Sequence, residues 1–147
     1  MNRCPAFHRD PLFLAAVLAG GCVWLLLWLF KPVPTMTLPQ VWSSRFLSLA
    51  LWQPLWEEML FRGVLQGQLG RHAWGQWAWW GVTTANGITS LLFVLGHLWR
   101  HPPLWALAVL APSLLFGYVR DRHASVYPAI ALHAIYNTGY FWLMGVP

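Results

Sequence analysis

Five long apolar segments, separated by short polar or proline-rich stretches, dominate this sequence. They cover about residues 12–30, 42–69, 80–99, 104–119 and 126–145. Because the interior of a bilayer offers no water to the backbone, only helices or closed barrels span it, and the sequence lacks barrel-like alternation. Segments of this length suit helices that cross a hydrocarbon core. We therefore predict an all-α fold, a polytopic transmembrane bundle of about five helices.

Composition supports a membrane protein. The 147 residues are 58% hydrophobic and 9% charged, whereas soluble domains are roughly 25% charged. Twelve tryptophans suit a chain with two water–lipid interfaces. The net charge of +5 comes from basic residues that mostly lie at the ends of apolar runs, whereas a nucleic-acid surface would gather them on one face. We expect a lipid bilayer as the surroundings and no nucleic-acid partner.

Basic residues and prolines also indicate the topology. The run Pro11–Phe30 is too long for a typical signal-peptide core and no small-x-small cleavage site follows it, so we predict an uncleaved anchor that ends at Lys31-Pro32-Val33-Pro34. With the N-terminus in the cytoplasm, five basic residues lie inside and three outside. The inner set is Arg3, Arg9, Arg71, Arg120 and Arg122, and the outer set is Lys31, Arg45 and Arg100.

Residues 70–80 form an aromatic connection between the second and third segments. Four tryptophans and Arg71 occur among these eleven residues. Because indole rings and basic side chains favour the headgroup level, we expect an interfacial stretch here.

Half of the chain's four carboxylates, Glu57 and Glu58, stand side by side in the second segment. Glu58 and Arg62 are four residues apart, so they share one helical face and can pair, while Glu57 lies about 100° round the helix. Pro54 lacks an N–H, so a helix that continues through it would release the carbonyl of Ala50 and kink beside the acids. Ionisable groups in a membrane are expensive, and they indicate a functional site.

Further polar side chains occur one helical turn apart in two other segments. The third segment carries Phe93 and His97, and the fifth carries His133 and Asn137. Each feature alone has a structural interpretation: a staple for the Glu–Arg pair, packing for a histidine, interhelical bonding for Asn137. Together, on three segments, they favour one shared polar site.

Such a site can hydrolyse a carbonyl compound. A carboxylate and a neutral imidazole can activate a water, and a second imidazole with an amide donor can stabilise the oxyanion. No serine or cysteine is placed with a base as a nucleophile. Two glutamates and two histidines can in principle hold zinc, but the sequence lacks a His-Glu-x-x-His helix. We expect no cofactor, with zinc the less favoured alternative.

These motifs resemble those of the CAAX-protease and bacteriocin-processing family, the intramembrane glutamic endopeptidases related to the protease that trims CAAX termini. Glu57-Glu58-x-x-x-Arg62 matches the first motif, Phe93-x-x-x-His97 the second and His133-x-x-x-Asn137 the third. The resemblance covers about residues 43–145. It implies a catalytic core over 43–147 behind an N-terminal segment, 1–42, with one transmembrane helix.

The resemblance also implies roles for the residues. Glu57 and His97 would activate the water, His133 and Asn137 would form the oxyanion site, and Glu58 and Arg62 would support the geometry. The substrate would be a membrane protein or peptide cleaved near the membrane surface. The short core is similar to bacterial members dedicated to C-terminal sorting signals of the JDVT-CTERM kind, which implies a multi-pass protein of the bacterial inner membrane.

Two points stay open from the sequence. The alternative function is a non-catalytic membrane protein in bacteriocin immunity or maturation, which would use the polar cluster for structure or binding. Straight helices with 1.5 Å rise per residue would put His97 near the outer end of its span and Glu57 deeper. Either the third helix begins deeper in the membrane than expected, following a re-entrant stretch around residues 77–80, or the expected boundaries are wrong by a turn.

Overall fold

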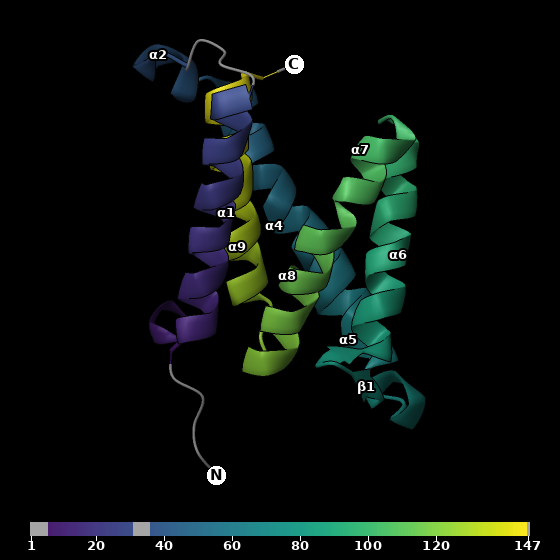
Figure 1. The fold of residues 1–147 in the computed structure, drawn as a ribbon. Helices are drawn as coiled ribbons and strands as arrows, with labels where there is room; N and C mark the ends of the chain where they lie inside the picture. The colour runs from purple at the N-terminus through teal and green to yellow at the C-terminus, as the bar shows by residue number, and fades with distance from the viewer. Residues whose placement is uncertain (1–5, 31–35, 147) are drawn as a thin grey trace. The chain divides into compact units, whose positions relative to one another are not determined.

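The computed structural model describes residues 6–30 and 36–146 of the chain. Every one of the five apolar segments is helical over most of its length, so the predicted all-α class is confirmed (Figure 1). The predicted proline stop after the first helix lies outside the described residues, and so do Arg3 and Lys31.

The chain divides into two compact units. One consists of residues 1–56 together with 130–147, and the other of residues 57–129. We call them the terminal unit and the central unit, and each is described by itself. The boundary predicted after residue 42 concerns the catalytic core, and it stays a prediction.

In the terminal unit, α1 (Pro11–Phe30) packs closely against α9 (Tyr127–Met144). The hydroxyl of Tyr136 donates a 2.7 Å hydrogen bond to the carbonyl of Ala16. A Cβ added to Gly20 would overlap the ring of Tyr136, and one added to Gly139 would overlap Trp24. Two short helices, η1 (Phe7–Arg9) and α2 (Leu38–Val41), also belong to this unit.

A long helical stretch carries the glutamates and changes its register twice. It consists of α3 (Ser44–Leu47), η2 (Ser48–Trp52), α4 (Gln53–Glu58), η3 (Met59–Leu65) and α5 (Gln66–Leu69), and η2 and η3 are π-helical. Segments of π-helix are rare and occur frequently at functional sites. Here they lie on both sides of the turn that carries Glu57 and Glu58.

The register of η2 corrects the expectation about Pro54. In a π-helix each N–H bonds the carbonyl five residues back, and Gln53 N indeed donates to the carbonyl of Ser48. The missing N–H of Pro54 therefore leaves the carbonyl of Leu49, and not that of Ala50, without its helical donor. The side-chain amide of Asn137 donates to this carbonyl at 3.0 Å.

The central unit continues with η4 (Ala73–Gln76) and a two-stranded antiparallel hairpin, β1 (Ala78–Trp79) and β2 (Val82–Thr83). Helix α6 (Thr84–Leu98) begins only after the hairpin, since the Thr83 side chain caps it by accepting from Asn86 N. The prediction that the third helix begins at about Trp80 was therefore wrong by about one turn. Helices α7 (Pro103–Ala108) and α8 (Leu110–His123) follow.

Helices α6 and α8 pack through buried polar contacts. The amide of Asn86 donates to the carbonyl of Leu114 at 2.9 Å. A Cβ on Gly117 would overlap Asn86, so the helices approach closely because residue 117 has no side chain. Two helical stretches among the described residues, Pro11–Phe30 and Pro103–His123, are long and apolar enough to cross a membrane.

Candidate functional site

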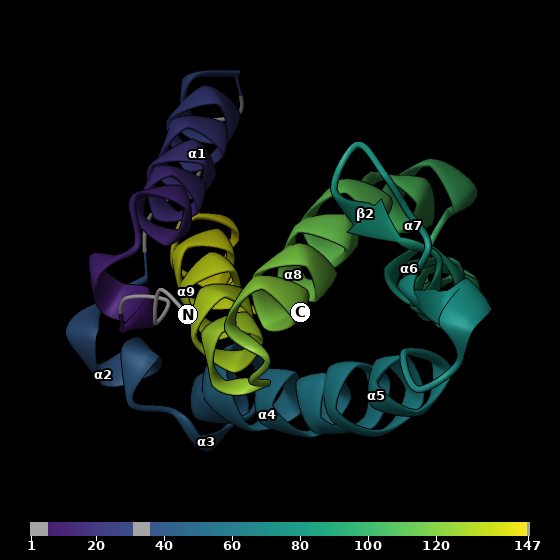
Figure 2. The same cartoon turned by 90° about the horizontal axis from the view of Figure 1, so that it is seen from below.

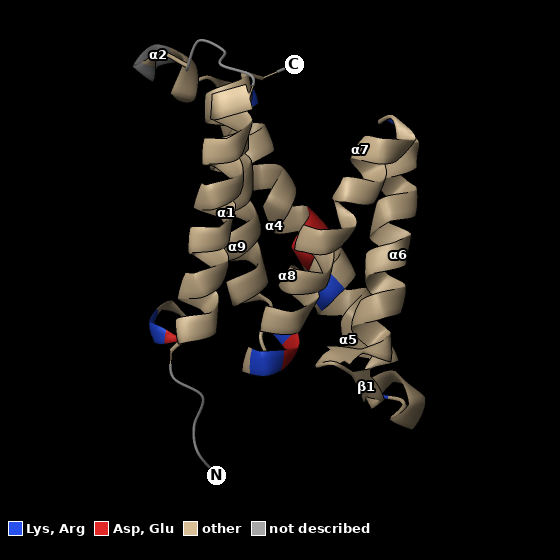
Figure 3. Cartoon of the chain, viewed as in Figure 1, with Lys and Arg blue, Asp and Glu red and all other residues tan. Residues whose placement is uncertain are grey.

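Glu58 and Arg62 form a fully buried ion pair in the central unit. The Arg62 Nε and Glu58 Oε2 atoms lie 3.1 Å apart, and both side chains are 0% exposed. The expected pairing across one helical turn is therefore present. Figure 3 shows this charged turn between the labels α4 and α5, within a helix whose neighbouring residues are uncharged.

Helix α8 holds the other end of the Arg62 guanidinium. Its Nη2 donates to the hydroxyl of Ser113 at 2.6 Å and to the carbonyl of the same residue at 2.9 Å. The guanidinium carbon lies 4.7 Å from the ring centre of Phe93 and 5.8 Å from that of Phe116. Arg62 therefore has an anion, two oxygen acceptors and two aromatic rings around it, which fixes its position.

One turn further along, Gln66 repeats the contact to α8. Its amide donates to the carbonyl of Gly117 at 3.0 Å, and the side chain is 0% exposed. Sequence reasoning missed both Gln66 and Ser113. The spacing of Gln66 from Arg62 offered a signal, because residues four apart share a helical face. Ser113 offered none, since it lies 51 residues from Arg62.

Glu57 lies beside this buried pair and is only half-buried. The two neighbouring acids therefore have different surroundings, as different roles would require.

His97 lies near the C-terminal end of α6 and is half-buried. Its Nδ1 atom is 2.8 Å from the carbonyl oxygen of Phe93. A carbonyl oxygen only accepts, so Nδ1 carries the hydrogen and donates it. In the neutral ring, Nε2 then keeps its lone pair and can act as a base. The ring also stacks on Trp105, with centroids 5.9 Å apart.

Aromatic packing puts Glu57 and His97 at the same level of the central unit. The rings of Phe61 and Phe93 meet edge to face with centroids 5.0 Å apart. Glu57 lies four residues before Phe61, and His97 four residues after Phe93. Both steps lead away from the hairpin, so each residue lies about one turn, or 6 Å, beyond the ring contact.

This level removes the depth mismatch expected from the sequence. Counted from the hairpin side, Glu57 lies twelve residues from the end of α5 and His97 thirteen residues from the start of α6. The two counts differ by one residue only, so Glu57 and His97 lie at a similar level. The cause is the start of α6 at Thr84, so the expected boundary was wrong by about one turn, which is the second of the two explanations.

His133 and Asn137 belong to the terminal unit, on α9. His133 is 7% exposed, and Asn137 is half-buried with one amide hydrogen bonded to Leu49. The structure thus describes Glu57, Glu58, Arg62 and His97 within the central unit, where Glu57 and His97 lie at a common level on two packed helices. It describes His133 and Asn137 one turn apart in the other unit.

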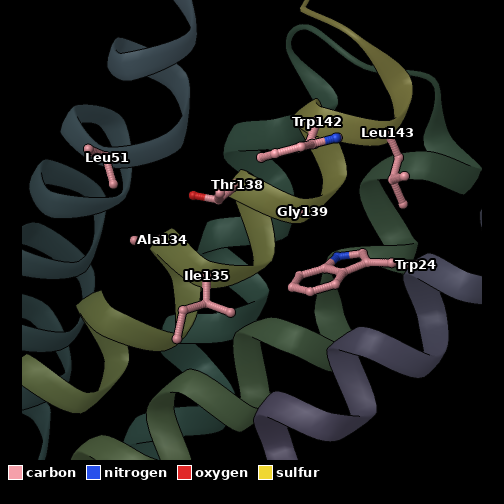
Figure 4. A pocket seen from close by; sticks show the side chains of 8 residues that line it. All are labelled: Trp24, Leu51, Ala134, Ile135, Thr138, Gly139, Trp142 and Leu143. Carbon is pink, nitrogen blue, oxygen red and sulfur yellow. The ribbon is translucent and has the colours of Figure 1, made fainter. Parts of the chain in front are cut away.

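The terminal unit also contains an apolar pocket of about 470 Å³ on α9 (Figure 4). Trp24, Thr138 and Trp142 are among its lining residues. The lining carries no acid or base, so the pocket by itself cannot transfer protons. Within the described residues, no group of three or more His, Cys, Asp and Glu side chains is arranged to hold a metal ion.

Comparison with known proteins identifies a family. The sequence model described as type II CAAX prenyl endopeptidase Rce1-like matches residues 39–139. This range contains all six candidate residues. Comparison with curated proteins gave no match, and comparison with solved structures gave none.

Proposed function

Because the chain belongs to the type II CAAX prenyl endopeptidase Rce1-like family, we propose that it is an intramembrane endopeptidase in which Glu57 and His97 activate the attacking water without a metal. The family is one of membrane-embedded proteases, so the general activity is peptide-bond hydrolysis. The observation that carries the specific mechanism is the common level of Glu57 and His97 on two packed helices.

In the proposed reaction, the Glu57 carboxylate accepts one proton as the water oxygen attacks the scissile carbonyl carbon. The lone pair on His97 Nε2 accepts a hydrogen bond from the other hydrogen and orients the water. The carbonyl oxygen becomes an oxyanion. When the C–N bond breaks, Glu57 returns its proton to the leaving amine, and the products are a carboxylic acid terminus and a free amine. The acid then releases the second water proton to the solvent and becomes a carboxylate.

Glu58 and Arg62 support this chemistry from the buried side. Arg62 neutralises Glu58 and is itself held by Ser113, so the pair fixes the turn that carries Glu57. The assignment of His133 and Asn137 to the oxyanion site comes from the family motifs. The imidazole of His133 or the side-chain amide of Asn137 would donate a hydrogen bond to the developing oxyanion.

The substrate is proposed to be a membrane protein or peptide cleaved near the membrane surface. The family's description points to prenylated CAAX termini, and removal of a C-terminal sorting signal is the second candidate, from the resemblance of the motifs. We further propose a multi-pass protein of the bacterial inner membrane with its N-terminus in the cytoplasm, which agrees with the positions of the arginines in the sequence.

A cleavage assay tests this proposal. The purified protein, reconstituted in vesicles, would be incubated with a peptide that ends in farnesyl-cysteine, two aliphatic residues and methionine, and with the same peptide lacking the farnesyl group. Mass spectrometry would locate the cut. We expect cleavage that persists in phenanthroline and is lost in His97→Asn.

Other outcomes would redirect the proposal. Cleavage abolished by phenanthroline and restored by zinc would replace the metal-free mechanism. If neither peptide, nor the apolar tail of a small protein encoded beside the gene, is cut by well-folded protein, the non-catalytic alternative in immunity or maturation would be favoured. The hydrogen bond from Asn137 to Leu49 is the observation that agrees with such a structural use.

A further inference from the structure

The hairpin between η4 and α6 presents a tryptophan in an unfavourable backbone conformation. At its tip, Trp80 has φ 54° and Gly81 has φ 82°. Two central residues with positive φ are typical of a type I′ turn, where Asn and Gly are the usual residues. A bulky side chain with positive φ is an outlier that costs strain. A strained tryptophan at this position is explained if the indole of Trp80 itself binds something.

The neighbouring side chains extend this aromatic tip. Trp77, Trp79 and Trp80 are 79%, 80% and 89% exposed. The backbone that carries them is well fixed, since Thr84 N donates to the carbonyl of Trp77 at 2.7 Å. Three exposed indoles on a fixed hairpin form an apolar surface with polar N–H edges, which matches the region between headgroups and acyl chains.

Basic residues lie beside the tip. The hydroxyl of Thr83 donates to Asp121 at 2.7 Å, so the C-terminal turn of α8 lies against β2 (Figure 2). This turn carries Arg120 and Arg122, and Arg120 pairs with Asp121 at 2.9 Å. Arg71, exposed, precedes η4. Arg71, Arg120 and Arg122 outnumber Asp121 in this region, so its net charge is positive, which is complementary to anionic phospholipid headgroups.

We propose that the hairpin tip, defined as Trp77, Trp79 and Trp80 with the basic rim of Arg71 and Arg122, binds the headgroup region of a bilayer that contains anionic lipid. The hairpin joins α5 to α6, the helices that lead to Glu57 and His97. Its binding would therefore fix how far both residues lie from the headgroup level.

The test measures the depth of the hairpin in vesicles. A nitroxide would be attached through Ala78→Cys, on β1, in a chain that carries Cys4→Ser and Cys22→Ala. The vesicles would be phosphatidylcholine with or without a third of phosphatidylglycerol. Electron paramagnetic resonance would compare collisions of the label with oxygen, which partitions into lipid, and with a water-soluble nickel complex.

Trp80→Asn is the informative variant, because Asn suits the turn while it removes the indole. We expect the label to lie at headgroup level in the mixed vesicles and to gain nickel accessibility in Trp80→Asn or when phosphatidylglycerol is omitted. Trp99→Asn is the matched control: Trp99 is also 89% exposed but follows the far end of α6. This control should leave the nickel accessibility of the label unchanged. The thermal unfolding temperature of Trp80→Asn should be no lower than that of the wild-type protein.

Three results would overturn the proposal. One is a label that does not respond to Trp80→Asn, and another is a label that does not respond to the lipid charge. Alternatively, dipolar broadening between labels would show that a second copy of the chain covers the tip. None of these measurements uses peptide cleavage, so they are independent of the proposed enzymatic activity.

Discussion

The buried ion pair between Glu58 and Arg62 makes a quantitative prediction about stability. Glu58→Gln keeps the shape of the side chain but removes the charge that lies 3.1 Å from Arg62. At an effective dielectric constant of about 20, the lost attraction is about 5 kcal/mol. Removing one partner of a buried pair typically costs about 3–5 kcal/mol, because the remaining charge is left uncompensated. We expect a loss of about 3 kcal/mol, since Ser113 still holds the guanidinium.

The assay is equilibrium unfolding of the purified protein in mild detergent, followed by circular dichroism. Glu57→Gln is the matched control, because Glu57 is adjacent and half-buried, and it should cost clearly less. The double variant Glu58→Gln, Arg62→Met removes both charges and should recover most of the loss. The reasoning would be refuted if Glu58→Gln cost no more than Glu57→Gln, or if the double variant were as unstable as the sum of its parts.

Further predictions concern the contacts between helices of the central unit. Ser113→Ala removes the 2.6 Å hydrogen bond from Arg62 to the hydroxyl but keeps the one that Arg62 donates to the backbone carbonyl. The free energy of unfolding should therefore fall by about 1.5 kcal/mol, and no measurable loss would contradict a fixed guanidinium. In Gly117→Ala the new methyl group would overlap the side chain of Asn86, and the free energy of unfolding should fall by up to about 3 kcal/mol. The control is Gly87→Ala, where an added Cβ meets nothing within 4 Å, and it should stabilise α6 by about 0.5–1 kcal/mol. Equal effects of Gly117→Ala and Gly87→Ala would contradict the close approach of α6 and α8.

The sequence predicted the helices and the local pairing well, because both depend on neighbouring residues. Apolar length gave the helical segments, and the spacing of four residues gave the pair of Glu58 and Arg62. The register of the helix around them was not predictable, because the segment is apolar on nearly every side, so the shift in facing that a π-turn causes leaves no visible break in its pattern. Only Pro54 indicated a disturbance, and the carbonyl that it frees depends on that register.

Long-range partners were also beyond the sequence. Ser113 is an ordinary polar residue in an apolar segment, and its role follows from the packing of α8 against the Arg62 side chain. The hairpin offered a signal in Gly81, which favours a turn with positive φ. The tryptophans around it instead extended the apparent apolar run, so the helix was expected to begin too early.

The central claim is that Glu57 acts as the base for the attacking water while Glu58 serves the structure. The most direct measurement is kcat for cleavage of the farnesylated peptide by Glu57→Gln, with the variant's unfolding measured in parallel. The account predicts a fall in kcat of at least about a hundredfold in a protein that unfolds almost like wild type. Retained cleavage by a well-folded Glu57→Gln protein would contradict it.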